Sequence, residues 1–310
     1  MLPISDHLLE RLLARGATSE VWSATRMGPD GFTAPVALKT LTTQHLHAPE
    51  RVEAFVAEAR AGATVLHPNV VHTQALLHAD GRYWLAMQLV RGWSVAALLA
   101  RSAASGRPIP LPIAVAIARD AASGLEAIHA VGLVHGDIAP DNLMLAATGH
   151  AMVLDFGAAT ARNAVRPRLA PAASSYAAPE LRTRTWVEAR ADVWSLGAVL
   201  RELVPEELEV PFLLDSAIAR ALNPDPTRRF PSAGALAIAL ELIARREGWL
   251  VTPSDVAAHL RETMAAAPPR PLADGSHIGP LAKLERPAAR PRGLVDAALV
   301  ARASGAKRPP

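Results

Sequence analysis

The sequence predicts an α+β fold with two lobes, in which a strand-rich lobe is followed by a mostly helical lobe. Two observations carry this prediction. Short apolar runs separated by turn residues fill residues 1–90, around one segment with helical periodicity. From residue 91 onward, the apolar residues recur every three or four positions instead. Strands grouped before helices are typical of α+β proteins, and a cleft between lobes is a common ligand site.

Residues 1–90 are expected to form the first lobe, with five strands around one helix. The helix is predicted over Glu50–Leu66, because Val52, Phe55 and Ala59 would share one side of it. The strands are expected at Leu8–Leu13, Val21–Thr25, Val36–Thr40, Val70–Leu77 and Tyr83–Leu89.

Residues 91–248 are expected to form the second lobe, which is built mainly of helices. Two extended pieces at Leu143–Leu145 and Ala151–Leu154 predict a small hairpin within it. A short helical extension is expected over residues 249–266, with its helix at Ser254–Met264. The helices of the lobe itself are expected at Ser94–Ala100, Ile113–His129, Ala191–Leu203, Ser216–Ala221 and Ala233–Glu247.

The last segment, residues 267–310, is rich in Pro, Ala and Arg and is predicted to be a disordered tail. Its net charge is +5 against +3 for the whole chain, so residues 1–266 carry about −2. The high isoelectric point therefore belongs to the tail, and no specific nucleic-acid partner is indicated. Weak contact between the tail and an acidic partner and a simply solvated tail are both open readings.

Composition also argues against several kinds of site and of membrane segment. The chain has no Cys, which excludes disulfides and thiolate metal sites and fits a cytoplasmic location. The eleven His show no metal-ligand spacing. We expect no signal peptide at the N-terminus and no membrane-spanning helix, because the apolar stretch Ile113–Ile128 is interrupted by Arg119, Asp120 and Glu126.

Eight short motifs follow one another along the chain, and their order and spacing are more informative than any one of them. They are Val36-Ala37-Leu38-Lys39, Phe55-x-x-Glu58, His67-Pro68-Asn69-Val70-Val71, the run His135-Gly136-Asp137 to Asn142, Asp155-Phe156-Gly157, Tyr176-Ala177-Ala178-Pro179-Glu180, Asp192 to Gly197, and Arg228-Arg229-Phe230.

Together these motifs resemble the bacterial branch of the eukaryotic-like Ser/Thr protein kinase family, over residues 8–246. The resemblance implies a bilobal kinase fold and transfer of the γ-phosphoryl group of ATP to Ser or Thr of protein substrates, with Mg²⁺. A pseudokinase that binds nucleotide or partner proteins without efficient transfer is the main alternative. A small-molecule kinase is disfavoured by the Tyr176–Glu180 segment and by Arg228.

Five polar residues would carry the chemistry. Lys39 would place its charge against the ATP phosphates, with Glu58 as its counter-ion or, alternatively, as a solvated helix carboxylate. Asp155 and Asn142 offer the oxygen ligands that suit Mg²⁺. Asp137 would orient the substrate hydroxyl and accept its proton.

The resemblance also implies an adenine site. Met87 would guard its back pocket, and the backbone of Gln88 and Val90 would face the adenine edge. The ring would lie between Val21, Ala37 and Met144. For these apolar residues a core role is almost as well supported as ligand contact.

The nucleotide loop, residues 13–21, departs from the family pattern. Family members carry three glycines there, so that the backbone can approach the phosphates. Only the central Gly16 is kept, and Ala14 and Ser19 stand at the outer positions. Small replacements are expected to weaken this loop without excluding nucleotide.

Three further departures concern catalysis and its control. Ala139 replaces the Lys that usually neutralises the moving phosphoryl group, and Ala173 replaces a Thr that contacts this Lys. Pro140 and Asp141 offer no substitute Arg, which disfavours a tyrosine kinase. Gly136 replaces the Arg that receives an activation-loop phosphate, making this a non-RD kinase whose activity is expected not to depend on that phosphate.

Two charged residues are expected to have structural roles. Glu180 resembles one half of an ion pair that attaches the activation segment to the helical lobe, with Arg228 as the other half. Asp192 is expected to hold the backbone of the loop that contains Asp137.

Overall fold

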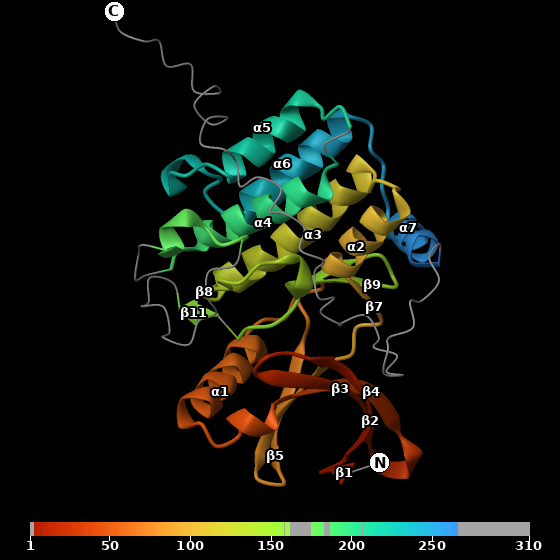
Figure 1. The fold of residues 1–310 in the computed structure, drawn as a ribbon, viewed down its shortest axis with the longest axis vertical. Helices are drawn as coiled ribbons and strands as arrows, with labels where there is room; N and C mark the ends of the chain where they lie inside the picture. The colour runs from red at the N-terminus through yellow and green to blue at the C-terminus, as the bar shows by residue number, and fades with distance from the viewer. Residues whose placement is uncertain (1–2, 158, 162–174, 183–186, 206–207, 266–310) are drawn as a thin grey trace, which may run out of the picture.

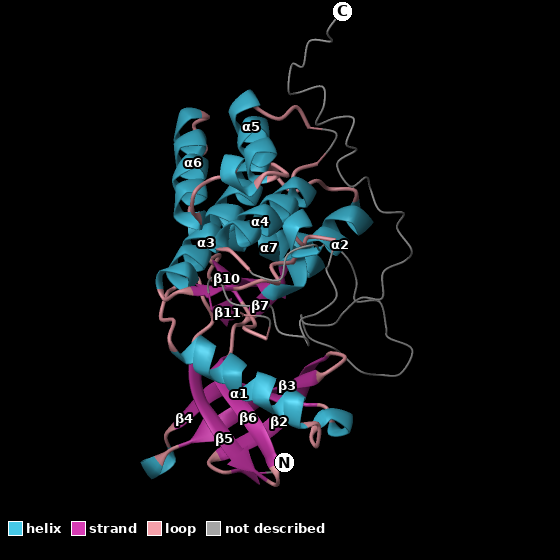
Figure 2. Cartoon of the chain, turned by 90° about the vertical axis from the view of Figure 1, so that its left-hand side faces the viewer, coloured by secondary structure: helices cyan, strands magenta, loops and turns pink. Residues whose placement is uncertain are grey.

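The computed structural model describes residues 3–157, 159–161, 175–182, 187–205 and 208–265 (Figure 1). The first lobe is one antiparallel sheet with strand order β1-β2-β3-β4-β6-β5, and helix α1 (Pro49–Ala63) lies across it (Figure 2). The strands are β1 (Pro3–Ile4), β2 (His7–Arg15), β3 (Ser19–Met27), β4 (Thr33–Leu41), β5 (Thr73–Ala79) and β6 (Arg82–Gln88).

Alternation along the strands divides the sheet into two apolar faces. On one face, Leu41 and Leu85 pack with Phe55 and Ala59 of α1. The opposite face has its own cluster, which consists of Ile4, Ala24, Val36, Leu38, Trp84 and Ala86. Helix α1 therefore covers the face of the sheet on which Lys39 also lies, since Lys39 is two residues from Leu41 in the same strand.

The second lobe is helical, with a small sheet of order β10-β9-β7 and a separate pair β11-β8. Its helices are α2 (Val95–Ser105), α3 (Leu111–Ala130), α4 (Ala189–Leu203), α5 (Phe212–Ala221), α6 (Ala233–Arg246) and α7 (Pro253–Ala265). Its strands are β7 (Gly92–Ser94), β8 (Leu133–Val134), β9 (Leu143–Ala146), β10 (Ala151–Val153) and β11 (Thr160–Ala161). Short 3₁₀ helices cover Pro29–Gly31 and Thr43–His45 in the first lobe. Three others cover Pro140–Asn142, Pro179–Arg182 and Pro226–Arg228 in the second lobe.

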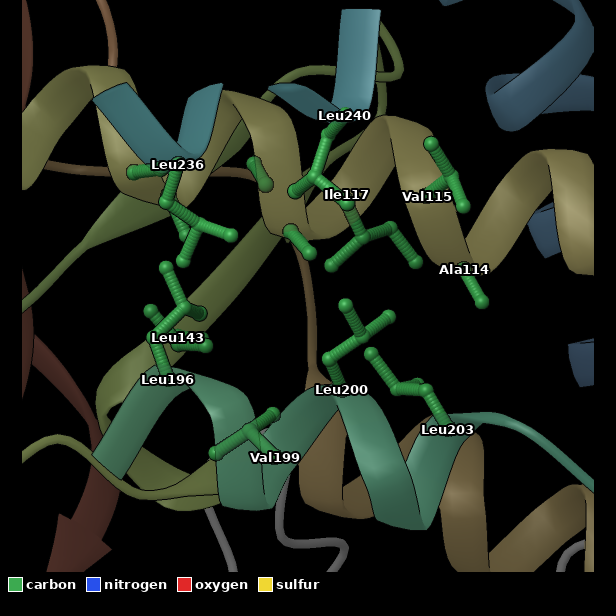
Figure 3. Packing of buried hydrophobic residues seen from close by; sticks show 14 of the residues in the cluster. Ala114, Val115, Ile117, Leu143, Leu196, Val199, Leu200, Leu203, Leu236 and Leu240 are labelled. Atoms are coloured by element: carbon green, nitrogen blue, oxygen red, sulfur yellow. The ribbon is translucent and has the colours of Figure 1, made fainter. Parts of the chain in front are cut away.

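Helix α3 forms the centre of this lobe because it is apolar on nearly every side. Figure 3 shows Leu240 of α6 and Leu200 of α4 on either side of Ile117 of α3, with Leu236 and Leu196 farther along the same two helices. All five side chains are essentially inaccessible to solvent. The C-terminal end of α3 leads into β8, on the side of the helical lobe that faces the first lobe (Figure 1).

The α+β fold with a strand-rich first lobe and a helical second lobe is confirmed, and most element ends lie within a few residues of those expected. The strand expected at Val70–Leu77 begins at Thr73. Val70 instead forms a parallel bridge with Val153, and the Val71 N–H donates to the Val153 carbonyl at 2.9 Å. The apolar residues before β5 therefore belong to a connection between the lobes.

Two expectations concern the chain ends and membranes. In the described ranges, we find no helix long and apolar enough to cross a membrane. The expected extension helix is present as α7. The expected tail, residues 267–310, lies outside the described residues.

Candidate active site

Three charged side chains from distant parts of the chain meet where the lobes face each other. Lys39 Nζ lies 2.6 Å from Glu58 Oε1 and 2.8 Å from Asp155 Oδ1. Lys39 comes from β4 and Glu58 from α1, and both are buried, whereas the Asp155 side chain is partly exposed. The expected Lys39–Glu58 contact is therefore present, and the solvated alternative for Glu58 does not hold.

Burial and mutual charge set the ionisation of this cluster. Burial alone would lower the pKa of Lys39, but the charges of Asp155 and Glu58 outweigh it and raise that pKa. Partial removal of Asp155 from water likewise opposes its ionisation, but Lys39 holds the pKa of this carboxyl well below its usual range. Burial raises the pKa of Glu58 to about 8, although Lys39 opposes it. One ammonium thus contacts two carboxyls, and of these the pKa of Glu58 is raised whereas that of Asp155 is lowered.

The raised pKa of Glu58 predicts a pH-dependent stability for the nucleotide-free protein. Between its usual pKa of 4.5 and about 8, folded Glu58 holds a proton that the unfolded chain has released. Stability should therefore fall as the pH rises through this range, by at most about 1.4 kcal/mol per pH unit. Urea unfolding at about pH 5.5, 7 and 8.5 measures this fall. Glu58→Gln cannot titrate and should lack it, so an equal slope in this variant would contradict the assignment.

Backbone geometry places the Asp155 carboxylate. Asp155 has a φ of 64°, in the left-handed region that Asp adopts more readily than most residues. Its Oδ1 accepts the Gly157 N–H at 2.9 Å. The next side chain, Phe156, is buried, and its ring centroid lies 6.1 Å from that of His135. The packed Phe156 ring fixes the turn that presents Asp155 to Lys39.

Asp137 and Asn142 lie together on the loop after β8. Asn142 Nδ2 donates to the Asp137 carbonyl at 2.7 Å and to Asp137 Oδ2 at 3.2 Å. The Leu154 N–H donates to the Asn142 carbonyl at 2.9 Å, which ties this loop to the residue before Asp155. The structure thus brings the expected proton acceptor and both expected metal ligands to neighbouring backbone segments.

Asp192 holds this loop, as expected. Its carboxylate is fully buried and accepts the N–H groups of His135 and Gly136, both at 2.8 Å. His129 Nε2 lies 2.8 Å from the same carboxylate. Burial would raise the pKa of Asp192, but these hydrogen bonds hold it below its usual range. Gly136 has a φ of 75°, so the residue in place of the family Arg occupies a conformation that glycine adopts without strain.

The donor set fits a magnesium ion that is shared with a polyphosphate. Both contacts from Asn142 to Asp137 use its amide nitrogen, so the amide oxygen is the atom available to a cation. Lys39 and Gly157 both contact Oδ1 of Asp155, and Oδ2 takes part in neither of these two contacts. Among the described residues, no group of three or more His, Cys, Asp or Glu could hold a metal alone. Mg²⁺ commonly takes one or two protein ligands and completes its shell with phosphate oxygens and water.

The expected adenine residues of the first lobe share a face of the sheet. Val21 pairs with Lys39 across β3 and β4, and Ala37 pairs with Met87 across β4 and β6. Directly paired residues lie on the same face, so these side chains line the side on which Lys39 meets Asp155.

The other residues expected at the adenine site lie at the end of β6, in the segment that joins the lobes, and in the second lobe. Met144 is buried in β9 of the second lobe. Gln88 ends β6, and its N–H donates to the His72 carbonyl at 2.9 Å. Val90 is half-buried in the segment that joins the lobes.

The nucleotide loop is a closed hairpin turn between β2 and β3. The Gly16 N–H donates to the Ser19 carbonyl at 2.8 Å, and the side chains of Arg15 and Glu20 pair at 3.0 Å. Ala14 pairs with Val21 in the strand register. None of these residues has a positive φ, so the backbone here accommodates Ala14 and Ser19.

The partner of Glu180 is Arg229, and the expectation of Arg228 is wrong. The Arg229 guanidinium donates to both Glu180 carboxylate oxygens, at 2.6 and 2.7 Å. Arg229 is buried and also donates to the Arg190 carbonyl at 2.9 Å. Arg228 is exposed and lies 3.7 Å from Asp225. Either of the two adjacent arginines would fit the motif in the sequence. In the structure, only Arg229 points into the protein toward Glu180, whereas Arg228 points to solvent.

Some expected residues cannot be placed. Ala173, with the rest of residues 162–174, lies outside the described residues. Ala139 is described and is half-buried, immediately before the 3₁₀ turn that carries Asn142.

Composition carries one signal that the motifs alone do not show. The chain has 32 Lys and Arg residues, of which only Lys39, Lys283 and Lys307 are lysines. Lys39 is therefore the single lysine in the first 282 residues. An ammonium is a compact point charge that Arg does not replace, so its retention in an Arg-rich chain supports a specific role.

The comparisons with known proteins agree with this geometry. Residues 8–221 match the family described as the protein kinase domain. Tyrosine-protein kinase MasK of Myxococcus xanthus is 32% identical over an alignment of 277 residues, which covers 77% of this chain and 43% of the relative once gaps are left out. Serine/threonine-protein kinase PknH of Mycobacterium tuberculosis is 30% identical over an alignment of 294 residues, which covers 85% of this chain and 46% of the relative.

Serine/threonine-protein kinase PknA of Mycobacterium tuberculosis is 33% identical over an alignment of 225 residues, which covers 69% of this chain and 50% of the relative. The chain thus spans about half the length of the curated relatives it matches. The matched region contains Lys39, Glu58, Asp137, Asn142 and Asp155. The chain therefore belongs to the protein kinase family and to its bacterial Ser/Thr branch.

Proposed function

We propose that this chain transfers the γ-phosphoryl group of ATP to Ser or Thr hydroxyls of protein substrates, with Mg²⁺. The contact of Lys39 with both Glu58 and Asp155, at 2.6 and 2.8 Å, carries this proposal. It joins three segments that are far apart in sequence into one charged cluster beside Asp137 and Asn142. A module that had abandoned catalysis would not need this arrangement, and the kinase relatives also do not favour the pseudokinase alternative.

The residues divide the work of phosphoryl transfer. Lys39 offsets phosphate charge, and Asp155 and Asn142 would hold Mg²⁺, which neutralises charge on the phosphate oxygens. Asp137 accepts the proton of the substrate hydroxyl as the new oxygen–phosphorus bond forms. The bond from the γ-phosphorus to the bridging oxygen breaks, and ADP leaves with that electron pair.

The adenine site is proposed for the face described above. Val21 and Ala37 would cover the ring from the first lobe and Met144 from the second, with Met87 behind it. Backbone groups of Gln88 and Val90 would bind the adenine edge. Gly16 would lie over the phosphates. The shared sheet face of Val21, Ala37 and Met87 supports this placement.

The function is tested with labelled ATP, Mg²⁺ and generic protein substrates. Wild type should transfer label to itself or to a substrate, and Lys39→Met should lose nearly all transfer because the phosphates lose their cation. Equal, negligible transfer by both proteins would sink the proposal. A thermal shift with Mg·ATP would then separate a nucleotide-binding pseudokinase from a chain that binds none. Phosphoamino-acid analysis separates Ser/Thr from Tyr products, which matters because MasK is named as a tyrosine kinase.

We further propose that activity does not require a phosphate on the activation segment. Gly136 stands where an Arg would receive that phosphate, so no cation at this position needs to be neutralised. Replacing Thr160, Ser174 and Ser175 together with Ala should leave initial rates within about threefold of wild type, since no phosphate–Arg contact is lost there. Abolished activity in the triple variant would contradict this.

The tail carries no specific proposal of a partner. Weak contact of residues 267–310 with an acidic partner stays a prediction from charge, as does a cytoplasmic location from the absence of Cys.

A further inference from the structure

Helix α7 lies beyond residues 8–221, which match the kinase family, and it packs beside α2 on the helical lobe (Figure 1). Val256 and Leu260 on its inner side are buried in the core cluster of that lobe, which also contains residues of α2. At its end, the Met264 carbonyl accepts a hydrogen bond from the Arg101 guanidinium at 3.3 Å. The helix is therefore docked on the kinase fold along its whole length.

The first turn of α7 lies against Gly149, which is in the turn between β9 and β10. A β-carbon at Gly149 would lie 1.7 Å from the Pro253 carbonyl oxygen and 3.0 Å from the Ala257 nitrogen. Both atoms belong to the backbone of α7, so no side chain can rotate away to make room. Gly149 also has a φ of 93°, in the region that favours glycine. Only glycine therefore lets the hairpin turn and the helix backbone approach this closely.

Both sides of this close approach are held in place by hydrogen bonds. The N–H and hydroxyl groups of Thr252 donate to Asp255 Oδ2 at 2.8 and 2.7 Å, and the Asp255 N–H donates to Thr252 Oγ1 at 3.3 Å. Reciprocal contacts of this kind fix the first turn of a helix. In the hairpin, the Gly149 N–H donates to the Ala146 carbonyl at 2.8 Å, and the Ala146 N–H donates to the His150 carbonyl at 2.9 Å.

The hairpin that α7 contacts carries two residues of the proposed nucleotide site. Asn142 directly precedes β9, and Met144 lies within this strand. Met144 pairs with Met152 in the register, and the Leu154 N–H donates to the Asn142 carbonyl at 2.9 Å. A paired ladder therefore runs from the turn at Gly149 to Asn142. Because the paired strands move together, a displaced turn displaces the other end of the hairpin as well.

Two further contacts join α7 to the nucleotide site. The Ala147 N–H, in the same turn as Gly149, donates to the Arg91 carbonyl at 2.7 Å, and Arg91 follows Val90 in the segment that joins the lobes. Helix α2 packs against α7 and also against the 3₁₀ turn that carries Asn142. The docking of α7 therefore bears on the adenine side and on the metal side of the site.

We propose that α7 supports the nucleotide site, and that its docking against the bare backbone of Gly149 keeps Asn142 and Met144 in position. Gly149 is then a positioning residue that acts through the hairpin. The docking is a property of the fold, and its consequence for nucleotide rests on the proposed function. The competing reading is that α7 only links the helical lobe to the residues that follow it.

The test uses Gly149→Ala and Leu260→Ala in the full chain. The first change pushes α7 away from the hairpin, and the second leaves a cavity beneath α7 two turns after Pro253. Gly81→Ala is the matched control, because Gly81 also lies in a hairpin turn with a φ of 72°, and no described atom lies within 4 Å of a β-carbon placed there. Hydrogen exchange with mass spectrometry follows α7 and the hairpin. Mg·ADP affinity and the kcat and KM for ATP are measured in parallel.

In Gly149→Ala, residues 253–265 and 142–153 should exchange faster than in wild type. The KM for ATP and the Kd for Mg·ADP should rise by about 10-fold, as misplacement of a site by a fraction of an ångström does. Leu260→Ala should shift the same quantities in the same direction. A protein that was only less stable would lose active molecules and therefore kcat, with an unchanged KM. Gly81→Ala should keep both constants within about twofold of wild type, because it strains a surface turn in the other lobe.

Three outcomes would overturn the inference. One is wild-type exchange of α7 in Gly149→Ala. Another is faster exchange of α7 in either variant while residues 142–153 exchange as in wild type. The third is faster exchange of α7 with wild-type KM and Mg·ADP affinity, as the linker reading predicts. If Gly149→Ala does not fold, Leu260→Ala decides by the same criteria.

Failure of the proposed function gives a different result. If wild type binds Mg·ADP but transfers no phosphate, the proposed transfer fails, while Mg·ADP affinity in the variants still decides the role of α7. If wild type binds no Mg·ADP either, the exchange of residues 142–153 decides it alone. Faster exchange there in Gly149→Ala supports the inference, and an unchanged rate overturns it.

Discussion

Asp137→Asn should slow phosphoryl transfer by about 10²–10⁴-fold, the usual worth of a positioned general base. Asn has the shape of Asp and can still accept the Asn142 Nδ2–H, which lies 3.2 Å from Asp137 Oδ2 in the structure. It cannot take the proton of the substrate hydroxyl. Initial rates at saturating Mg·ATP measure the loss.

A neighbouring carboxylate provides the matched control. Asp141 lies in the same loop and is exposed. Asp141→Asn removes the same charge within four residues of Asp137 and should keep the rate within about twofold, as surface substitutions usually do. Mg·ATP affinity should change little in either variant, because neither residue is assigned to nucleotide or metal. If Asp137→Asn kept more than about a tenth of the rate, Asp137 would not be the base.

Glu180→Ala should destabilise the folded chain by about 3–5 kcal/mol, because it leaves the buried guanidinium of Arg229 without its carboxylate. Arg229 is only 1% exposed and donates two short hydrogen bonds to the Glu180 carboxylate. Its guanidinium also lies 4.9 Å above the Trp194 ring, so it cannot reach water without disturbing that packing. Urea unfolding measures the loss as a lower midpoint with an unchanged slope.

Arg228→Ala is the control for this prediction. Its side chain is 73% exposed and pairs loosely with Asp225. An exposed pair of this kind contributes about 0–1 kcal/mol, so this variant should unfold close to wild type. A larger loss in Arg228→Ala than in Glu180→Ala would reverse the assignment of the pair.

The residues behind these two experiments differ in how far the sequence alone could predict them. The order of the motifs points to Asp137 and Asn142, which are five residues apart in the sequence. In the structure the two side chains are in contact. The partner of Glu180 was assigned one residue too early. Arg228 and Arg229 have the same chemistry and differ in sequence by one step, but Arg228 ends the 3₁₀ turn Pro226–Arg228 and Arg229 follows it with an extended backbone. The Arg228 side chain is exposed, whereas the Arg229 side chain is buried. Only one of them can therefore reach Glu180.

Local patterns predicted the α+β class, the helices α1–α7 and the strands β2–β6, β9 and β10, but not the short strands β1, β7, β8 and β11. The order of the motifs, which is also a property of the chain itself, pointed to Lys39, Glu58, Asp137, Asn142 and Asp155. The tertiary structure decided which of these residues touch. The contact between Lys39 and Asp155 joins residues 116 positions apart, and the bridge between Val70 and Val153 ties the lobes behind it. At Gly62 the backbone of α1 comes so close to β5 and to Phe156 that an added β-carbon would lie 2.3 Å from Thr73 Oγ1 and 3.3 Å from Phe156 Cδ2. Such distances are set by packing between segments, which no local pattern in the sequence records.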